Sequence, residues 1–68
     1  MNHREELGQI LKEIRERKGF TLRELSAETG IHFSNIAKIE KGKFNVGIDQ
    51  IKKICDVLGC TIEIKAAE

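Results

Sequence analysis

The sequence predicts an all-α domain of four short helices followed by one short strand. Three observations support this fold class. Apolar residues recur at helical spacing in four segments, glycines separate these segments, and the last apolar residues of the chain alternate with polar ones. The chain has 68 residues, 40% of them hydrophobic, which is enough for one core only. We therefore expect a single domain over residues 1–68.

The first helix is predicted from about Arg4 to Lys18. Gly19 ends it. Apolar residues at intervals of three and four positions form one stripe along this segment, which predicts that this side of the helix packs on the core. The stripe consists of Leu7, Ile10, Leu11 and Ile14.

The second helix has a clear beginning and a clear end in the sequence. Thr21 and Glu24 have the spacing of a capping box, in which each residue binds the backbone N–H of the other. This motif predicts that the helix begins at Leu22. We expect it to end near Thr29, because Gly30 can adopt the left-handed conformation that closes a helix.

A third helix follows after a very short connection. Only two or three residues, within 30–32, separate the second helix from the apolar pair Ile36 and Ile39, and Gly42 ends this third segment. Such a short, glycine-containing connection makes the two helices cross steeply instead of lying antiparallel. The segment is therefore predicted to be a helix-turn-helix unit.

The fourth helix is predicted over Ile48–Leu58. A loop over Lys43–Gly47 precedes it, Gly47 serves as its N-cap, and Gly59 ends it.

The two cysteines do not indicate a metal site. Cys55 and Cys60 have no second cysteine pair, and neither His3 nor His32 lies at a zinc-finger distance from them. We therefore predict no metal, and we expect Cys55 to be a buried thiol in the apolar series of the fourth helix. That series is Ile48, Ile51, Ile54, Cys55 and Leu58.

The tail over Cys60–Lys65 has the period of two that is typical of a half-buried strand. A single strand leaves its backbone groups unpaired, so it either pairs with another chain or frays at the terminus. We predict antiparallel pairing with the same strand of a second copy across a two-fold axis. The residues assigned to this dimerisation contact are Thr61, Ile62, Glu63 and Ile64.

Charge is distributed unevenly along the chain. The net charge of +1 by itself argues weakly against a nucleic-acid partner. Residues 32–53, however, contain five lysines and two acidic residues, whereas the remaining residues contain seven basic and nine acidic ones. We therefore expect the positive segment to hold the DNA-facing element.

Residues from Leu7 to Leu58 resemble the Cro/C1-type helix-turn-helix family of phage repressors and bacterial regulators. The resemblance is carried by LGQILKEIRERKGFTLRELSAETGIHFSNIAKIEKGK and by IDQIKKICDVLG. It implies a four-helix, lambda-repressor-like domain in which the third helix enters the major groove and the second lies across the phosphate backbone. The strand-like tail, in place of a fifth helix, is similar to HipB-type antitoxins, which dimerise through C-terminal strands.

The resemblance also implies roles for individual residues. It implies a buried structural ion pair between Arg15 and Glu40, and a glutamate among apolar neighbours does require such a partner. Residues of the third helix that face the groove are His32, Phe33, Ser34, Asn35 and Lys38. Residues at positions where the family contacts phosphate are Lys41, Lys43 and Asn45.

Three positions depart from the family pattern. Leu22 replaces the glutamine that is frequent at the start of the second helix, so one polar contact is missing. His32 stands where serine or threonine is the usual cap, and histidine caps less well. Phe33 replaces a polar reader. It is suited either to a thymine methyl group or to a partner protein, and the sequence leaves both roles open.

These features predict a cytoplasmic, homodimeric, sequence-specific regulator of transcription, a repressor or autoregulator, that binds a pseudo-palindromic operator. The alternative is an antitoxin that binds and neutralises a partner toxin protein. No membrane segment or leader is evident, and no cofactor is expected. An enzyme is not predicted, because the sequence shows no phosphate-binding glycine loop and no nucleophile beside a base.

Overall fold

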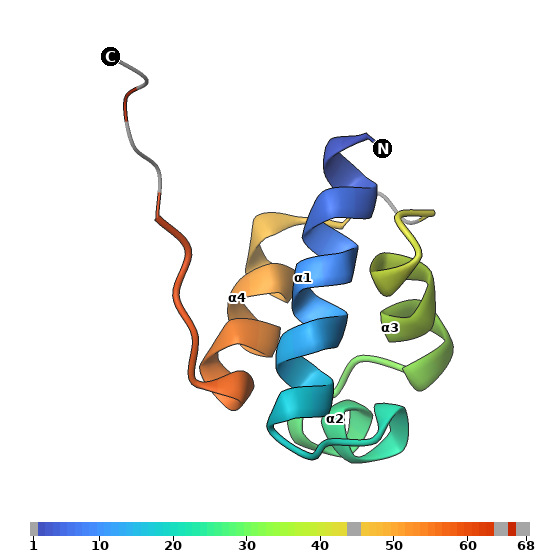
Figure 1. Cartoon of the computed structure of the whole chain (residues 1–68). Helices are drawn as coiled ribbons and strands as arrows, with labels where there is room; N and C mark the ends of the chain where they lie inside the picture. Colours follow the sequence, from blue (N-terminus) through green and yellow to red (C-terminus); the bar gives the residue numbers. More distant parts are fainter. Residues whose placement is uncertain (1, 44–45, 64–65, 67–68) are drawn as a thin grey trace.

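The computed structural model describes residues 2–43, 46–63 and 66. These residues form four helices: α1 (His3–Arg17), α2 (Leu22–Thr29), α3 (Phe33–Glu40) and α4 (Ile48–Leu58). In Figure 1, α1 runs between α3 and α4, and α2 crosses below its C-terminal end. The predicted all-helical fold with four helices is confirmed for this part of the chain. None of these helices is both long enough and apolar enough to cross a bilayer.

Two capping boxes begin α1 and α2. The side chain of Thr21 accepts the N–H of Glu24 at 3.0 Å, and the carboxylate of Glu24 accepts the N–H of Thr21 at 2.9 Å, as predicted. The latter bond lowers the pKa of Glu24 below its usual 4.5. Asn2 and Glu5 form a second box that we did not predict. It begins α1 one residue earlier than expected.

The turn between α2 and α3 is held by short-range hydrogen bonds. Gly30 has a φ of +76° and donates its N–H to the carbonyl of Ser26, which closes α2. The buried hydroxyl of Thr29 donates to the carbonyl of Leu25 at 2.8 Å and accepts the N–H of Ile31 at 3.2 Å. Because Ile31 is itself buried, the turn is anchored on the core and sets the direction in which α3 leaves it.

The core lies where the four helices meet, and each of them contributes to it. Cys55 belongs to it and is 5% exposed, so the prediction of a buried thiol is confirmed. Residues packed in this core are Leu11, Leu25, Ile31, Ile36, Ile39, Ile51, Ile54, Cys55 and Leu58.

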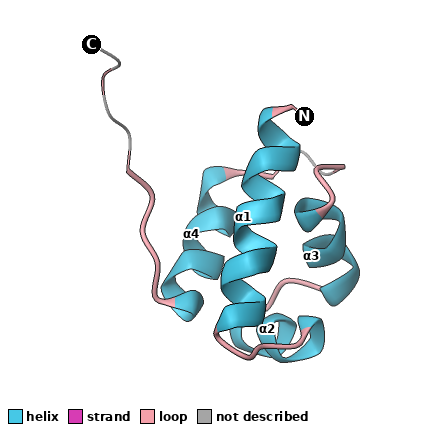
Figure 2. Cartoon of the chain, viewed as in Figure 1, coloured by secondary structure: helices cyan, strands magenta, loops and turns pink. Residues whose placement is uncertain are grey.

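The tail differs from the predicted strand. After Gly59, the described residues 60–63 form no strand, and Figure 2 shows them as a loop beside α4, where residues 60–62 line a groove with that helix. The physical reason is that a strand needs a second strand beside it to form a ladder of backbone hydrogen bonds, and the described residues contain no second strand. Ile64 and Lys65 of the predicted strand lie outside the described residues.

Candidate nucleic-acid interface

Helix α3 has one face on the core and one face toward solvent. Ile36 and Ile39 are 1% and 2% exposed and hold the helix on the core. Lys38 is exposed, and Ser34 and Asn35 are half-buried. The polar side chains that the sequence assigned to the groove therefore lie outside the hydrophobic core, on an amphipathic helix whose other side is fully packed.

The imidazole of His32 caps the N-terminus of α3. Its Nδ1 accepts the N–H of Ser34 at 3.2 Å and lies 2.7 Å from the Ser34 hydroxyl oxygen. The side chains of His32 and Ser34 are thereby held together at the beginning of α3. The histidine thus performs the capping role for which the sequence suggested it was poorly suited.

Three planar groups stack at the point where α2 and α3 begin. The guanidinium carbon of Arg23 lies 4.3 Å from the centroid of the Phe33 ring. The ring of His32 lies 4.5 Å from that of Phe33, with 26° between the two planes. Sequence reasoning did not select Arg23. The available signal was a cationic residue in the first turn of α2, which the tight turn brings beside the aromatic residue that begins α3.

Cationic side chains surround the C-terminal end of α3. Gly42 has a φ of +73°, and the N–H of Lys43 donates to the carbonyl of Lys38 at 2.9 Å, which closes the helix and turns the chain back. Lys38, Lys41 and Lys43 are all exposed. The structure therefore places three lysines of the positive segment around one helix end. Asn45, also assigned to phosphate contact, lies outside the described residues.

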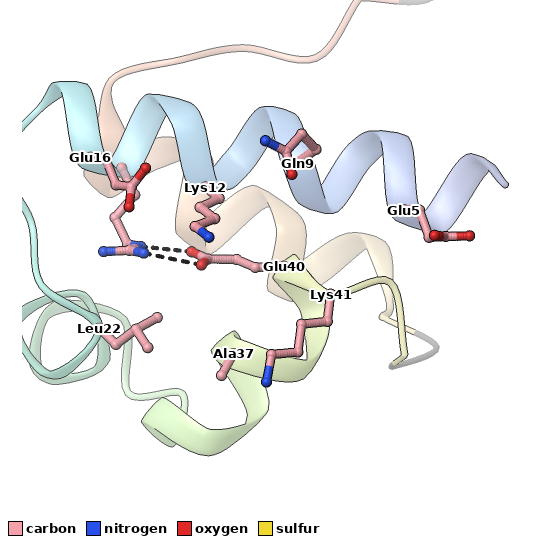
Figure 3. Close-up of a pocket in the computed structure, with 9 residues that line it drawn as sticks. Glu5, Gln9, Lys12, Glu16, Leu22, Ala37, Glu40 and Lys41 are labelled. Atoms are coloured by element: carbon pink, nitrogen blue, oxygen red, sulfur yellow. Dashed lines mark hydrogen bonds and ion pairs between the residues drawn. The ribbon is translucent and has the colours of Figure 1, made fainter. Parts of the chain in front are cut away.

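The structure brings Arg15 of α1 and Glu40 of α3 together. The Arg15 Nε donates to Glu40 Oε2 at 2.7 Å and Nη2 donates to Oε1 at 3.1 Å, while Nη1 donates to the carbonyl of Phe20 at 2.8 Å. Both residues line a hollow together with Leu22, and in Figure 3 the dashed lines mark the bonds that Glu40 accepts. The two side chains are only 9% and 7% exposed, and the bond to Glu40 raises the pKa of Arg15 above its usual value. The pair fixes the end of α3 against α1.

A close backbone approach between α1 and α3 was missed in the sequence. A Cβ at Gly8 would overlap the carbonyl oxygens of Ile39 and Glu40. Glycine is therefore required for α1 to lie this close to the last turn of α3. The glycine falls inside a regular helical stripe, and nothing local in the sequence shows that another helix backbone lies against it.

Comparisons with known proteins were consistent with this architecture. The family model described as Helix-turn-helix matches residues 11–65. The HTH-type transcriptional regulator SlrR of Bacillus subtilis (strain 168) is 32% identical over 63 residues, which cover 91% of this chain and 39% of SlrR. The chain thus spans about two fifths of the length of that curated relative.

Two solved structures are similar to most of this chain. One is the clp gene regulator ClgR from C. glutamicum, with a TM-score of 0.84 and 32% identity, covering 87% of this chain and 76% of that one. The other is the restriction-modification controller protein C.AhdI from Aeromonas hydrophila, with a TM-score of 0.81 and 30% identity, covering 84% and 86%.

Proposed function

The chain belongs to the helix-turn-helix family, and we propose from this membership that it is a sequence-specific, double-stranded DNA-binding regulator of transcription. The proteins to which this chain is similar include a transcriptional regulator, a gene regulator and a restriction-modification controller. The observation that carries the proposal is the polar outward face of α3. Lys38 is exposed there, while Ile36 and Ile39 hold the opposite face in the core.

In this proposal α3 lies in the major groove and reads base edges. Ser34, Asn35 and Lys38 have the donors and acceptors that base edges require, and a lysine ammonium suits the O6 and N7 acceptors of guanine. The Ser34 hydroxyl can accept from an amino group of adenine or cytosine through its oxygen lone pairs. Lys41 and Lys43 then contact phosphates beside the groove and contribute sequence-independent affinity.

We further propose that the regulator acts as a homodimer on a pseudo-palindromic operator, in the cytoplasm. Two exposed isoleucines support the homodimer. Ile48 of α4 is 66% exposed and Ile62 of the tail is 48% exposed. Both line one groove together with Thr61. A second copy that docks there would cover this apolar surface and supply the neighbour with which the tail pairs as a strand, as in HipB-type proteins.

The DNA-binding proposal is tested by selecting bound duplexes from a random pool at several salt concentrations. We expect one enriched motif with two half-sites about 34 Å apart and an affinity that falls steeply with salt. Binding with no enriched sequence, or no binding, would refute the proposal. Repression is then tested by placing the selected motif in a promoter and measuring transcription with and without the protein.

The dimer is tested separately by sedimentation equilibrium. We expect Ile62→Asp to shift the protein toward the monomer, because the substitution introduces a charge into the covered surface. Ile10→Asp is the matched control, since Ile10 is 53% exposed but lies on α1. Equal behaviour of the two variants would refute this interface. A monomer that binds a toxin through the same surface would favour the antitoxin alternative instead.

A further inference from the structure

The stack of Arg23, Phe33 and His32 joins the beginnings of the two helices of the helix-turn-helix unit. Arg23 lies in the first turn of α2 and Phe33 is the first residue of α3, so the stack bridges two elements that contact DNA in this fold. Arg23 and His32 are exposed and Phe33 is half-buried. The assembly is therefore a surface feature beside the first turn of the recognition helix.

The guanidinium of Arg23 is oriented but its donors are uncommitted. Among the described residues it makes the contact with Phe33 and neither a hydrogen bond nor an ion pair. Arg15 is the contrasting case, because its donors are taken by Glu40 and by the carbonyl of Phe20. A guanidinium that lies over an aromatic ring can still donate its N–H groups to an external acceptor.

The position of this arrangement favours a base over a phosphate. A guanidinium fork can pair with phosphate oxygens as well as with base edges, so its chemistry alone does not choose between them. Arg23, however, lies over the first residue of α3, the end of the recognition helix that meets base edges in this fold, and the planar pair of acceptors there is O6 and N7 of guanine. The phenyl ring beside it is apolar and suits the C5 methyl group of a neighbouring pyrimidine.

We propose that Arg23 is a specificity-determining residue that reads one guanine in each half-site, positioned by its stacking on Phe33. The edge of Phe33 contacts the methyl group of the adjacent thymine, and His32, the residue that caps α3, supports the ring. This inference rests on the proposed DNA-binding function and adds to it a reader that comes from α2. The sequence left two roles open for Phe33, contact with DNA and contact with a partner protein. The inference assigns it to DNA.

The test uses the duplex selected with the wild-type protein and changes single atoms of its bases. Replacing the guanine that Arg23 reads by 7-deazaguanine removes one acceptor and leaves the sequence and the charge unchanged. We expect the wild type to bind this duplex about tenfold more weakly. Arg23→Lys should bind the unmodified duplex more weakly than the wild type, and Arg23→Ala, which has no donor, should not respond to the deaza substitution at that position.

Phe33 is tested in the same way by replacing the adjacent thymine with deoxyuridine, which lacks only the methyl group. We expect the wild type to lose affinity severalfold and Phe33→Ala to be insensitive to this change. Arg17→Ala is the matched control, because Arg17 is an exposed arginine at the end of α1. It should respond to both modified duplexes as the wild type does. Circular dichroism checks that each variant is folded.

The outcomes separate this inference from the function on which it rests. If the wild type selects a motif but Arg23→Lys binds every duplex as the wild type does, Arg23 contacts phosphate. The inference is then refuted, while the proposed DNA-binding function still stands. The inference is also refuted if no deaza substitution of a guanine in the motif weakens binding of the wild type more than binding of the Arg23→Ala variant. If the wild type selects no motif, both the inference and the proposed function are refuted.

Discussion

The guanidinium of Arg15 and the carboxylate of Glu40 face each other through two hydrogen bonds, although 25 residues separate them in the sequence. The bonds connect the last turn of α1 to the last residue of α3. The same guanidinium holds the carbonyl of Phe20, in the loop that leads to α2. One buried side chain thus sets the position of the proposed recognition helix relative to two other elements.

Removing one partner of this pair should destabilise the fold strongly. We expect Glu40→Ala to lower the free energy of unfolding by about 3 kcal/mol, because it leaves a buried guanidinium without its counter-charge. Urea unfolding at pH 7, followed by circular dichroism, measures this change. The double variant Arg15→Met with Glu40→Leu should recover much of the loss, since it leaves no unpaired charge. A loss below about 0.5 kcal/mol for Glu40→Ala would contradict this account.

Adding a single carbon at Gly8 should also destabilise the protein. Its Cβ would overlap two carbonyl oxygens at the end of α3, so α1 and α3 must move apart. We expect Gly8→Ala to cost about 2 kcal/mol, net of the roughly 1 kcal/mol by which alanine favours a helix over glycine. Thermal and urea unfolding measure it. Gln9→Ala, at the next and exposed position, should stay within about 0.5 kcal/mol of the wild type.

The two thiols should differ in reactivity. Burial raises the pKa of Cys55 from 9.0 to about 11, with a smaller contribution from the neighbouring Cys60 thiol. At pH 8 the thiolate of Cys55 is therefore disfavoured in the folded protein, and we expect iodoacetamide to modify Cys60 first. The Cys60→Ser variant, which has only Cys55, should react slowly when folded and rapidly in 6 M guanidinium. Equal rates in the two conditions would contradict the burial.

The raised pKa of Cys55 also predicts a direction for stability at high pH. A thiol whose pKa is higher in the folded state favours folding below pH 9.0, and this contribution is lost as the pH rises toward 11. Cys55→Ala should therefore show a smaller decline of stability over that range than the wild type.

Lys38 should contribute sequence-dependent affinity for DNA. If it reads a base edge, Lys38→Ala weakens binding to the selected operator by about 1 to 3 kcal/mol and has less effect on a scrambled duplex. Fluorescence anisotropy on the two duplexes separates these effects. Lys41→Ala serves for comparison, since a phosphate contact should weaken both complexes equally and reduce the salt dependence. Equal losses for Lys38→Ala on both duplexes would assign Lys38 to the phosphate backbone.

Helix boundaries could be predicted because their causes are local. The capping box of Thr21 and Glu24 and the glycine that ends α2 act within a few residues, so their spacing is visible in the sequence. The box of Asn2 and Glu5 was equally readable and was missed. The tail shows the opposite case, because its alternation favours a strand, but a strand requires a second strand beside it and the described part of the chain contains none.

The candidate interface also has features that could be predicted and features that could not. Ile36 and Ile39 could be assigned to the core side of α3 without a structure, because helical periodicity places each residue on a face, and the charge count along the chain showed that lysines gather around this helix. The stacking of Arg23 on Phe33 and the contact of Gly8 with the backbone of α3 became visible only in the folded chain. These contacts depend on the angle and distance between whole helices, which result from the packing of the entire core and not from the spacing of neighbouring residues.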